Sequence, residues 1–430
     1  MRSFLQTMAS QAFPLAMAAV AGVFLARGLQ PEGRGVYATV TTTAGIATVV
    51  GHLSVGRSQT ALWPVLDRHR TLVGNAMVLG LVLGAAAGAA TFCVVTVMGL
   101  PVAPQLMVMA LLAVPFGVAA LNLKGVLLLQ SRVGLANRAT VLSAVVLYVP
   151  ILLLAVTGTL TLTAVVACWA VSTILPFALY VRPLGLPARG EAALARRQLA
   201  LSGRYHLGAV AFHLLLTVDV LLLNVWVTPA EVGLYTVATS FLSLSRVPTD
   251  ALAQVVVARQ AVRDEAEARA VTARTVRLNL MLGSAVVCSL ACVSPLLIPT
   301  LYGAAFSGSL TPLLALAPGT VAWSLLRPVE QYLVRLGRPM TMTAVAVCAL
   351  AANVALNTVL IPLWGAAGAA LASTLSYGAM AAVEVGWFAR VAGLGAGDLL
   401  PRAADVRWVA ASLRGRGRAA RDPVSARGSA

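Results

Sequence analysis

Long apolar stretches dominate this 430-residue chain. Each is long enough to cross about 30 Å of hydrocarbon as a helix. Only 10% of the residues are charged, whereas soluble domains carry about a quarter. The chain is therefore predicted to be an all-α polytopic membrane protein. We predict twelve transmembrane helices, which lie near residues 6–26, 36–56, 72–98, 103–129, 138–157, 160–181, 205–227, 232–257, 278–299, 308–333, 340–361 and 365–389.

Most of the basic residues fall in connections that lie on one side of the membrane. When the N-terminus is placed in the cytoplasm, 26 of the 31 basic residues fall in the cytoplasmic connections and the two ends. The opposite connections carry only Arg27 and Arg34, and the other three basic residues lie within spans. The positive-inside rule then predicts that both termini are cytoplasmic. Topology accounts for the net charge of +17, and no aromatic-interleaved basic region supports binding of nucleic acid.

One segment occurs twice. Leu25–Thr42 and Leu223–Ser240 align without a gap, and the alignment pairs Pro31 with Pro229, Gly35 with Gly233 and Tyr37 with Tyr235. In each copy a short turn rich in Pro and Gly separates two apolar stretches, which is typical of a membrane hairpin. The chain therefore reads as a duplication.

The predicted domains follow from this duplication. We expect an N-terminal six-helix bundle over 1–182, a cytoplasmic linker over 183–204, a C-terminal six-helix bundle over 205–390 and a basic flexible cytoplasmic tail over 391–430. Because six is even, both bundles begin on the same side of the membrane. They are predicted to be parallel repeats related by an axis along the membrane normal.

Four groups of residues resemble a known family. They occur in the order Leu25–Tyr37 (LAR-x-L-x-P-x-x-x-G-x-Y), Pro229 with Gly233-Leu234-Tyr235, Leu301–Phe306 (LYGAAF), and Asn353–Ala370 with Asn357 and the Ile361-Pro362-Leu363-Trp364-Gly365 run. Their order and spacing within twelve spans resemble the multidrug/oligosaccharidyl-lipid/polysaccharide flippase superfamily, and within it the bacterial polysaccharide flippases of O-antigen or exopolysaccharide type. The resemblance covers residues from about 4 to about 390.

This resemblance implies both a fold and an activity. The two bundles are expected to form a V-shaped cavity that opens to one membrane face at a time. The protein is expected to be a transporter and not an enzyme, and to turn polyprenyl-diphosphate-linked oligosaccharide or polysaccharide repeat units from the inner to the outer leaflet of the bacterial cell membrane. Its expected partners are this lipid-linked glycan, membrane lipids and proteins of polysaccharide polymerisation and assembly.

Cationic side chains at membrane depth are candidates for holding the diphosphate. Lys124, Arg246 and Arg327 lie within predicted spans, where a charge costs about 2.5–3.5 kcal/mol on insertion scales. They can donate charge-assisted hydrogen bonds to phosphate oxygens. Arg27 and Arg57, at the ends of the first two spans, are further candidates at the mouths of the cavity. The alternative is that such charges form structural ion pairs, such as Arg246 with Asp250 and Arg327 with Glu330, or extend toward the interface.

A second set of residues is a candidate ion-coupling site. Asp219, Asn353, Asn357 and Ser373 are predicted to converge in the C-terminal bundle, and their oxygens are the hard ligands that a small cation prefers. The set is similar to the sodium site of related flippases for lipid-linked precursors, but Asn357 stands where that family can carry a carboxylate. Proton coupling through Asp219 is therefore an equal candidate. The alternative is that the asparagines only bond neighbouring helices. No cofactor beyond Na⁺ or H⁺ is expected.

Other functions remain open. A cation-coupled multidrug antiporter has the same expected fold but requires an acidic, aromatic-lined pocket, and no predicted span of the first half contains an acid. A lipid II-type flippase of peptidoglycan precursors differs only in its glycan. A membrane glycosyltransferase requires a large extramembrane catalytic loop, which the pattern of spans does not provide.

Overall fold

The computed structural model describes residues 2–184, 190–260, 264–336 and 339–407, and every regular element within them is helical. Parts of the predicted linker (185–189) and most of the predicted basic tail (408–430) lie outside these residues. The elements are α1 (Arg2–His52), α2 (Val55–Leu62), α3 (His69–Met98), α4 (Pro104–Leu111), α5 (Val114–Leu129), α6 (Val133–Val156), α7 (Leu162–Leu184), α8 (Ala192–Leu215), α9 (Val218–Trp226), α10 (Pro229–Ser243), α11 (Arg246–Gln260), α12 (Glu265–Tyr302), η1 (Ala304–Ser309), α13 (Leu310–Trp323), α14 (Leu326–Arg335), α15 (Pro339–Ala392) and η2 (Ala396–Leu399).

These helices fit the twelve predicted spans. Among the described residues, eight helices are long and apolar enough to cross a membrane, and the bent pair α8/α9 makes a ninth. Two of the eight are 53 residues long and contain two predicted spans each, because α1 breaks at Gln30 and α15 breaks at Gly365. The short helices α10 and α11 cover the predicted span at 232–257.

Several predicted spans are interrupted. The span near 103–129 divides into α4 and α5, and the span near 308–333 divides into α13 and α14. In these two spans, and in the span near 232–257, the second helix has a proline within its first three residues: Pro115 in α5, Pro328 in α14 and Pro248 in α11. Proline lacks the N–H that a helix interior requires but is accommodated in the first turn, so it favours restarting a helix at these positions.

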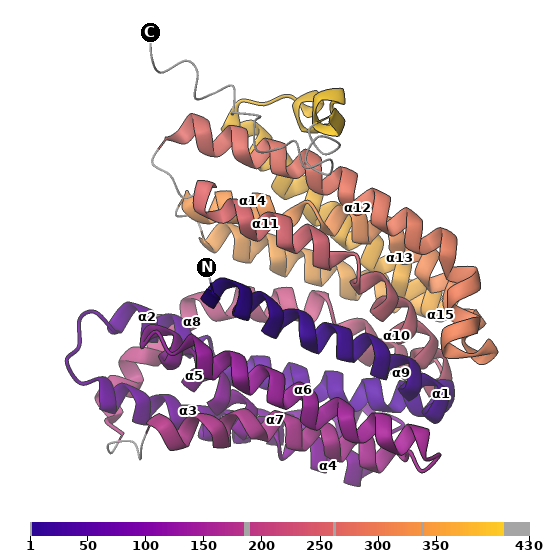
Figure 1. The fold of residues 1–430 in the computed structure, drawn as a ribbon, viewed down its shortest axis with the longest axis horizontal. Helices are drawn as coiled ribbons and strands as arrows, with labels where there is room; N and C mark the ends of the chain where they lie inside the picture. The colour runs from indigo at the N-terminus through magenta and orange to yellow at the C-terminus, as the bar shows by residue number, and fades with distance from the viewer. Residues whose placement is uncertain (1, 185–189, 261–263, 337–338, 408–430) are drawn as a thin grey trace. The chain divides into compact units, whose positions relative to one another are not determined.

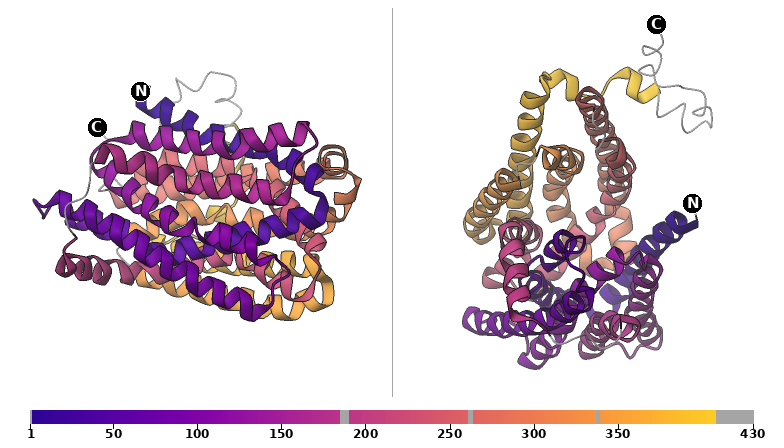
Figure 2. Two further views of the ribbon diagram at one scale, coloured as in Figure 1. Left: turned by 90° about the horizontal axis from the view of Figure 1, so that it is seen from below. Right: turned by 90° about the vertical axis from the view of Figure 1, so that its left-hand side faces the viewer.

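The structure separates into two compact units, which we describe individually. Unit 1 comprises Met1–Phe241, Val293–Leu316 and Met340–Ser376. Its helices α1 to α7 run side by side (Figures 1 and 2), and buried residues of α1, α4, α5, α6 and α7 form one apolar core that includes Leu25 and Ile151. The predicted division into N-terminal and C-terminal bundles stays a prediction.

Unit 2 comprises Leu242–Cys292, Ala317–Pro339 and Tyr377–Ala430. Residues after α15 return to α12, where Arg277 Nε lies 2.8 Å from Asp405 Oδ2 and Arg277 Nη1 donates to the Asp398 carbonyl. Burial opposes the ionisation of Asp405, but hydrogen bonds from Arg277 and the Arg402 backbone outweigh it, so the pKa of Asp405 lies below its ordinary value. This first part of the predicted tail is docked instead of lying free.

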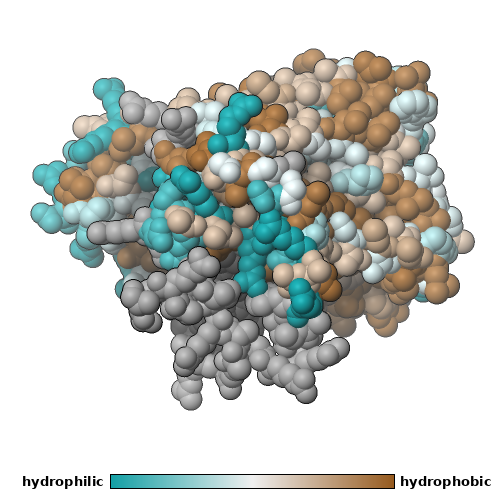
Figure 3. Space-filling model, turned by 90° about the horizontal axis from the view of Figure 1, so that it is seen from above, coloured by the Kyte–Doolittle hydropathy of each residue, from teal (hydrophilic) through white to brown (hydrophobic). Residues whose placement is uncertain are grey.

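The surface of the protein is largely apolar. Figure 3 shows wide areas of hydrophobic side chains, with hydrophilic side chains gathered toward one end of the visible face. Large aliphatic residues are strongly exposed on several helices, for example Val97 at 88%, Val156 at 75% and Leu296 at 68%. Exposed aliphatic area on this scale is unfavourable in water and favourable against lipid. The chain is a multi-pass membrane protein.

Candidate functional site

A bend in the seventh predicted span positions Asp219. The axes of α8 and α9 differ by 49°, and the break between them falls at Leu216 and Thr217. Asp219 is in the first turn of α9, where unpaired backbone N–H groups and the helix dipole favour a negative charge. Its side chain is nevertheless almost fully buried, with 1% of its surface exposed. The acid therefore depends on nearby donors for its stability.

Three side chains donate to the Asp219 carboxylate. The Tyr235 hydroxyl lies 2.6 Å from Oδ2, the Ser373 hydroxyl lies 2.5 Å from the same oxygen, and the Asn357 amide nitrogen lies 3.2 Å from Oδ1. Tyr235 lies on α10, whereas Asn357 and Ser373 both lie on α15. Asn357 comes before the break of α15 at Gly365, and Ser373 comes after it. Charge-assisted hydrogen bonds of this kind are the strong ones in proteins. Four helical segments of unit 1 thus meet at one carboxyl group.

The two asparagines complete the cluster. Asn357 Nδ2 also donates to Asn353 Oδ1 at 3.0 Å, and Asn353 Nδ2 lies 3.5 Å from the Ser373 hydroxyl. Asn353, Asn357 and Ser373 are fully buried. The structure therefore brings Asp219, Asn353, Asn357 and Ser373 together in one buried group. Their role as an ion-coupling site stays a prediction.

One oxygen of the cluster has no donor. Asn357 Oδ1 is buried and has no hydrogen-bond partner among the described residues. Buried amide oxygens are normally satisfied, so an unpaired one marks a place for a proton donor or a cation. The surrounding donor set of carboxylate, amide and hydroxyl oxygens fits a hard cation such as Na⁺. It contains no sulfur or imidazole ligand, and within the described residues no three His, Cys, Asp or Glu side chains lie close enough together to hold a metal ion.

Tyr235 belongs to this cluster but was missed from the sequence. It is the tyrosine of the second repeat copy, and it is 97% buried against Asp219. Its recurrence as Tyr37 was the available signal, but recurrence alone does not distinguish a packing residue from a hydrogen-bond donor. Only the fold of α9 against α10 shows which residue its hydroxyl reaches.

The two repeat copies touch each other through their glycines. A Cβ atom placed on Gly35 would lie 1.7 Å from the Pro229 carbonyl oxygen, and one placed on Gly233 would lie 2.0 Å from the Pro31 carbonyl oxygen. The contact is reciprocal, since each glycine packs against the proline of the other copy. Backbones can approach this closely only where neither residue has a side chain. The turns predicted from the duplication therefore form a joint inside unit 1.

Arg27 and Arg57 occupy different settings in unit 1. Arg27 Nε donates to the Leu301 carbonyl at 2.7 Å, and Arg27 Nη2 donates to the Thr300 carbonyl at 2.5 Å. Both carbonyls lie in the last turn of α12, where the helix leaves carbonyl groups unpaired. An arginine at the C-terminus of a helix satisfies these oxygens and complements the helix dipole. Arg57 is exposed on α2, close to the inner end of its predicted span. Arg27 is thus engaged by the protein itself.

Lys124 is the unpaired cation of unit 1 among the predicted set. It is half-buried on α5 and has no hydrogen bond or ion pair within the described residues. The adjacent Gly125 faces α2, because a Cβ atom there would lie 2.8 Å from Gln59 Oε1. Gln59 is itself fully buried with neither amide atom paired among the described residues. The residue next to Lys124 on α5 therefore packs against a buried amide that has no partner in this part of the chain.

Arg246 and Arg327 belong to unit 2. The guanidinium carbon of Arg246 lies 5.4 Å from the centre of the Trp323 ring, and its Nε is buried without a partner among the described residues. Arg327 lies 3.8 Å from Asp250 and 3.9 Å from Glu330. Asp250 thus faces Arg327, and not Arg246 four residues away as the helix spacing suggested. Of the two arginines, Arg246 has the freer guanidinium group.

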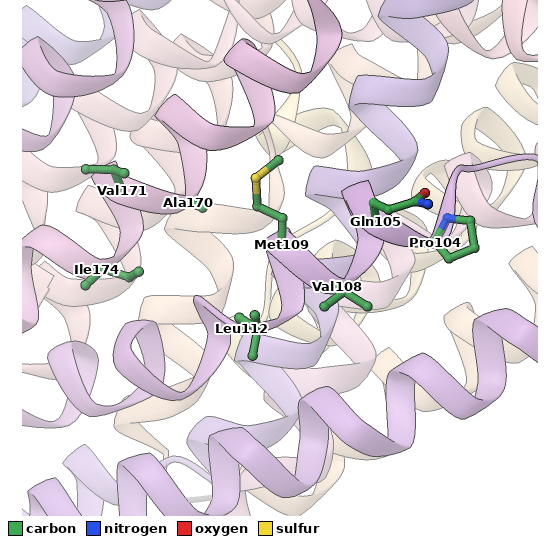
Figure 4. Close-up of a pocket in the computed structure, with 8 residues that line it drawn as sticks. All are labelled: Pro104, Gln105, Val108, Met109, Leu112, Ala170, Val171 and Ile174. Carbon is green, nitrogen blue, oxygen red and sulfur yellow. The ribbon is translucent and has the colours of Figure 1, made fainter.

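One pocket of unit 1 is apolar. It has a volume of about 550 Å³ and lies in unit 1 between α4 and α7. Figure 4 shows that Gln105 is the single polar side chain of its lining, near Pro104. Such a surface suits hydrocarbon and offers almost nothing to a charged headgroup. It does not contain any of the predicted site residues.

Solved structures share this arrangement of helices. The lipid II flippase MurJ in an inward closed conformation aligns with a TM-score of 0.74 over 92% of this chain and 89% of its own, at 11% sequence identity. An inward-facing multidrug resistance MATE family transporter of the MOP superfamily aligns with a TM-score of 0.71 over 90% of this chain and 98% of its own, at 15% identity. The chain has the fold of these transporters.

A third structure has the same fold at lower similarity. It is a MOP superfamily transporter from Pyrococcus furiosus described as having a binding pocket of reversed polarity, and it aligns with a TM-score of 0.57 at 14% identity over 90% of this chain and 94% of its own. No protein-family model matches the chain, and no curated protein matches it in sequence. The matched structures are transporters and not enzymes, and they agree with the fold expected from the repeat motifs.

Proposed function

We propose that the protein is a flippase that moves polyprenyl-diphosphate-linked oligosaccharide or polysaccharide repeat units from the inner to the outer leaflet of the bacterial cell membrane. The distribution of basic residues supports a topology with both termini in the cytoplasm. The fold supports alternating access, since the matched proteins are a lipid flippase and multidrug transporters. The expected partners stay the lipid-linked glycan, membrane lipids and proteins of glycan polymerisation and assembly.

The observation that carries this proposal is the unpaired Lys124. A lone ammonium at membrane depth costs several kcal/mol unless a counter-ion accompanies it. The described residues offer none, and a diphosphate supplies the missing charge together with strong hydrogen-bond acceptors. Arg246, stacked on Trp323 with a partnerless Nε, is the second cation available to the headgroup. Arg27, Arg57 and Arg327 stay in the proposal as secondary contacts.

The buried Asp219 cluster supports ion coupling. Asn357 Oδ1 has no donor within the described residues, and the neighbouring oxygens of Asp219, Asn353 and Ser373 complete a set that fits Na⁺ or a proton. Either ion, entering down its gradient, would replace or compete with the hydrogen bonds that now hold the four segments together. Loading and unloading of this cluster would then reset the transporter after each cycle.

Two alternatives share the fold. A flippase of lipid II-type peptidoglycan precursors is favoured by the structural likeness to MurJ. A cation-coupled multidrug antiporter is favoured by the likeness to MATE transporters and by the three acids Asp250, Glu330 and Glu384 in unit 2. The antiporter predicts transport of cationic dyes, which the two flippase hypotheses do not.

The decisive experiment uses the full-length protein in proteoliposomes. A fluorescent polyprenyl-diphosphate disaccharide is the substrate, and a membrane-impermeant quencher reports the leaflet in which it lies. Removing one charge-assisted contact worth about 1.5–3 kcal/mol lowers the rate of flipping roughly 10- to 100-fold. We therefore expect Lys124→Ala to lose flipping and Lys124→Arg to retain most of it.

A matched control lies on the same helix. Leu121 is 42% exposed on α5, and Leu121→Ala removes a comparable length of side chain without changing charge. The Leu121→Ala variant should flip the labelled substrate at the wild-type rate. Normal flipping by Lys124→Ala would remove the anion-carrier proposal, and transport of a cationic dye by the wild type would favour the antiporter.

A further inference from the structure

Two helices of unit 2 bring two acids to one arginine, and a third acid, Glu384, lies on a neighbouring element of the same unit. Asp250 lies on α11, Arg327 and Glu330 lie on α14, and Glu384 lies on α15. Arg327 Nε is 3.8 Å from Asp250 Oδ1, and Arg327 Nη1 is 3.9 Å from Glu330 Oε2. These separations exceed the 2.7–2.9 Å or so of a charge-assisted hydrogen bond, so the arginine holds both acids loosely. Asp250 and Glu330 thus share one guanidinium, so these three groups are formally one negative charge in excess.

Glu384 is the member without a partner. It is buried to 1% exposure, and neither of its carboxyl oxygens has a hydrogen-bond partner among the described residues. Its charge interacts with that of Glu330, which is a like charge. One turn further along α15, Phe388 packs edge-on against Tyr332 of α14 with ring centres 5.0 Å apart.

An ion pair does not explain this arrangement. The charged groups that interact with the Glu330–Glu384 pair in the described part of unit 2 are Arg327 and Asp250, and both act on Glu330. Arg327 is half-exposed and already shared between two acids. A buried carboxylate with no donor is among the least stable groups in a membrane protein, whereas the neutral acid is tolerated. Because Glu384 is buried and has no donor within the described residues, its protonated form is favoured.

We propose that Glu384 is a proton-binding carboxyl group in unit 2, with Glu330 as its like-charged neighbour, and that it is separate from the Asp219 cluster of unit 1. The two sites differ in chemistry: three donors satisfy Asp219, whereas Glu384 has none in the described chain. The exposed fraction of the side chain falls from 40% at Asp250 to 13% at Glu330, and Glu384 is buried.

A carboxyl-directed reagent tests this site without any transport substrate. Dicyclohexylcarbodiimide modifies carboxyl groups that are protonated and in apolar surroundings. The full-length protein in lipid nanodiscs is treated with the reagent at pH about 6 and about 9, and the labelled residue is identified by peptide mass spectrometry. We expect Glu384 to be labelled at the lower pH and at least about fivefold less at the higher pH.

Two variants sharpen the test. Glu330→Gln removes the like charge, so Glu384 gives up its proton more easily, and the loss of labelling should move to lower pH by about one unit. Asp219→Asn should leave the labelling of Glu384 unchanged, since Asp219 belongs to the other site. Glu384→Gln should abolish the label at this peptide.

Three outcomes would overturn the proposal. They are a wild-type Glu384 that stays unlabelled at both pH values, a pH dependence that Glu330→Gln does not move, and protection of Glu384 by sodium but not by potassium at equal ionic strength. The last would make Glu384 part of a metal-cation site. None of these measurements depends on flipping, so the result stands whether or not Lys124 binds a diphosphate.

Discussion

The two copies of the repeated segment have the same joint but opposite charges. In both copies the proline, the glycine and the tyrosine recur, and each glycine packs against the proline carbonyl of the other copy. The reciprocal geometry shows that the backbone of the turn is shared. A duplicated element that had diverged freely would not keep two contacts this close, because any side chain on either glycine would overlap a carbonyl oxygen.

The charged positions of the two copies do not correspond. Arg27 of the first copy aligns with Val225 of the second, and Arg34 aligns with Val232. In the opposite direction, Asp219 aligns with Ala21, just ahead of the first copy, and Glu231 aligns with Gly33. Ala21 and Val232 are fully buried, so neither of these two positions is simply a solvated surface site in the partner copy.

The tyrosine shows how one scaffold serves both kinds of charge. Tyr37 has the Arg34 guanidinium 5.7 Å from its ring centre, whereas the Tyr235 hydroxyl donates to Asp219 at 2.6 Å. An aromatic ring attracts a cation at its face and a phenol donates to an anion at its tip. The first copy holds Arg27, Glu32 and Arg34, and the second holds Glu231, so the net charge is positive in the first copy and negative in the second. This difference is in line with the proposed division between an anionic substrate and a coupling cation.

The largest effect is expected from placing a side chain on one of the two glycines, Gly35 or Gly233, at which the two repeat copies touch. Gly35→Val would push a branched side chain into the Pro229 carbonyl and should destabilise the protein by about 3 kcal/mol. Gly233→Val should have a similar effect, since the contact is reciprocal. Gly45→Ala on the same helix α1 has open space around it and is the control. Thermal unfolding of the purified protein measures the difference, and a Gly35→Val variant that melts with the wild type would show that the joint is not tight.

The next largest effect is expected from replacing Asp219 with alanine, the residue at the aligned position 21. Asp219→Ala reproduces Ala21 and leaves the donors Tyr235, Ser373 and Asn357 without their acceptor, at a cost of about 1–3 kcal/mol. Asp219→Asn keeps the shape and removes only the charge. We expect flipping by both variants to be lost or to become insensitive to collapse of the sodium or proton gradient. Wild-type dependence on the gradient in Asp219→Asn would reject the coupling role.

Replacing each of the two aligned tyrosines, Tyr37 and Tyr235, with phenylalanine compares the role of the hydroxyl group in the two copies. Tyr235→Phe removes a hydrogen bond to a buried acid and should lower the free energy of unfolding by about 1.5–2 kcal/mol. Tyr37→Phe keeps the ring beside Arg34, and the Tyr37 hydroxyl has no hydrogen bond within the described residues, so its effect should be smaller. Chemical denaturation of both variants in the same detergent gives the comparison. Equal losses would mean that the hydroxyl groups serve the same role in both copies.

The overall architecture was predictable because it depends on long-range patterns that survive in composition. Apolar stretches and the asymmetry of basic residues indicate spans and topology, and the repeat indicates the duplication. Asp219, Asn353, Asn357 and Ser373 were predicted to converge, and they lie together. The resemblance to a family supplied that grouping, since residues 219 and 373 are far apart in sequence.

Other features depend on side-chain directions that the sequence does not contain. The spans at 103–129 and 308–333 were predicted, but an apolar pattern does not show where, within a span, a helix ends and restarts at a proline. Spacing along one helix suggested that Arg246 would pair with Asp250, but Asp250 faces Arg327 from a neighbouring helix. The isolation of Glu384 was not visible either, because burial without a donor is a property of packing between helices.

The smallest expected effect concerns Arg27, where structure and function can be separated. Arg27→Gln removes two hydrogen bonds to the last carbonyls of α12 on an exposed side chain, so we expect a loss of only about 0.5–1 kcal/mol. Val225→Gln, at the aligned position of the second copy, controls for a glutamine at this register. If flipping falls about tenfold while the melting temperature hardly changes, Arg27 contacts the substrate in addition to α12. If both remain near wild type, the first copy contributes its charge to helix capping, and Lys124 alone among the unit 1 cations carries the case for an anionic headgroup.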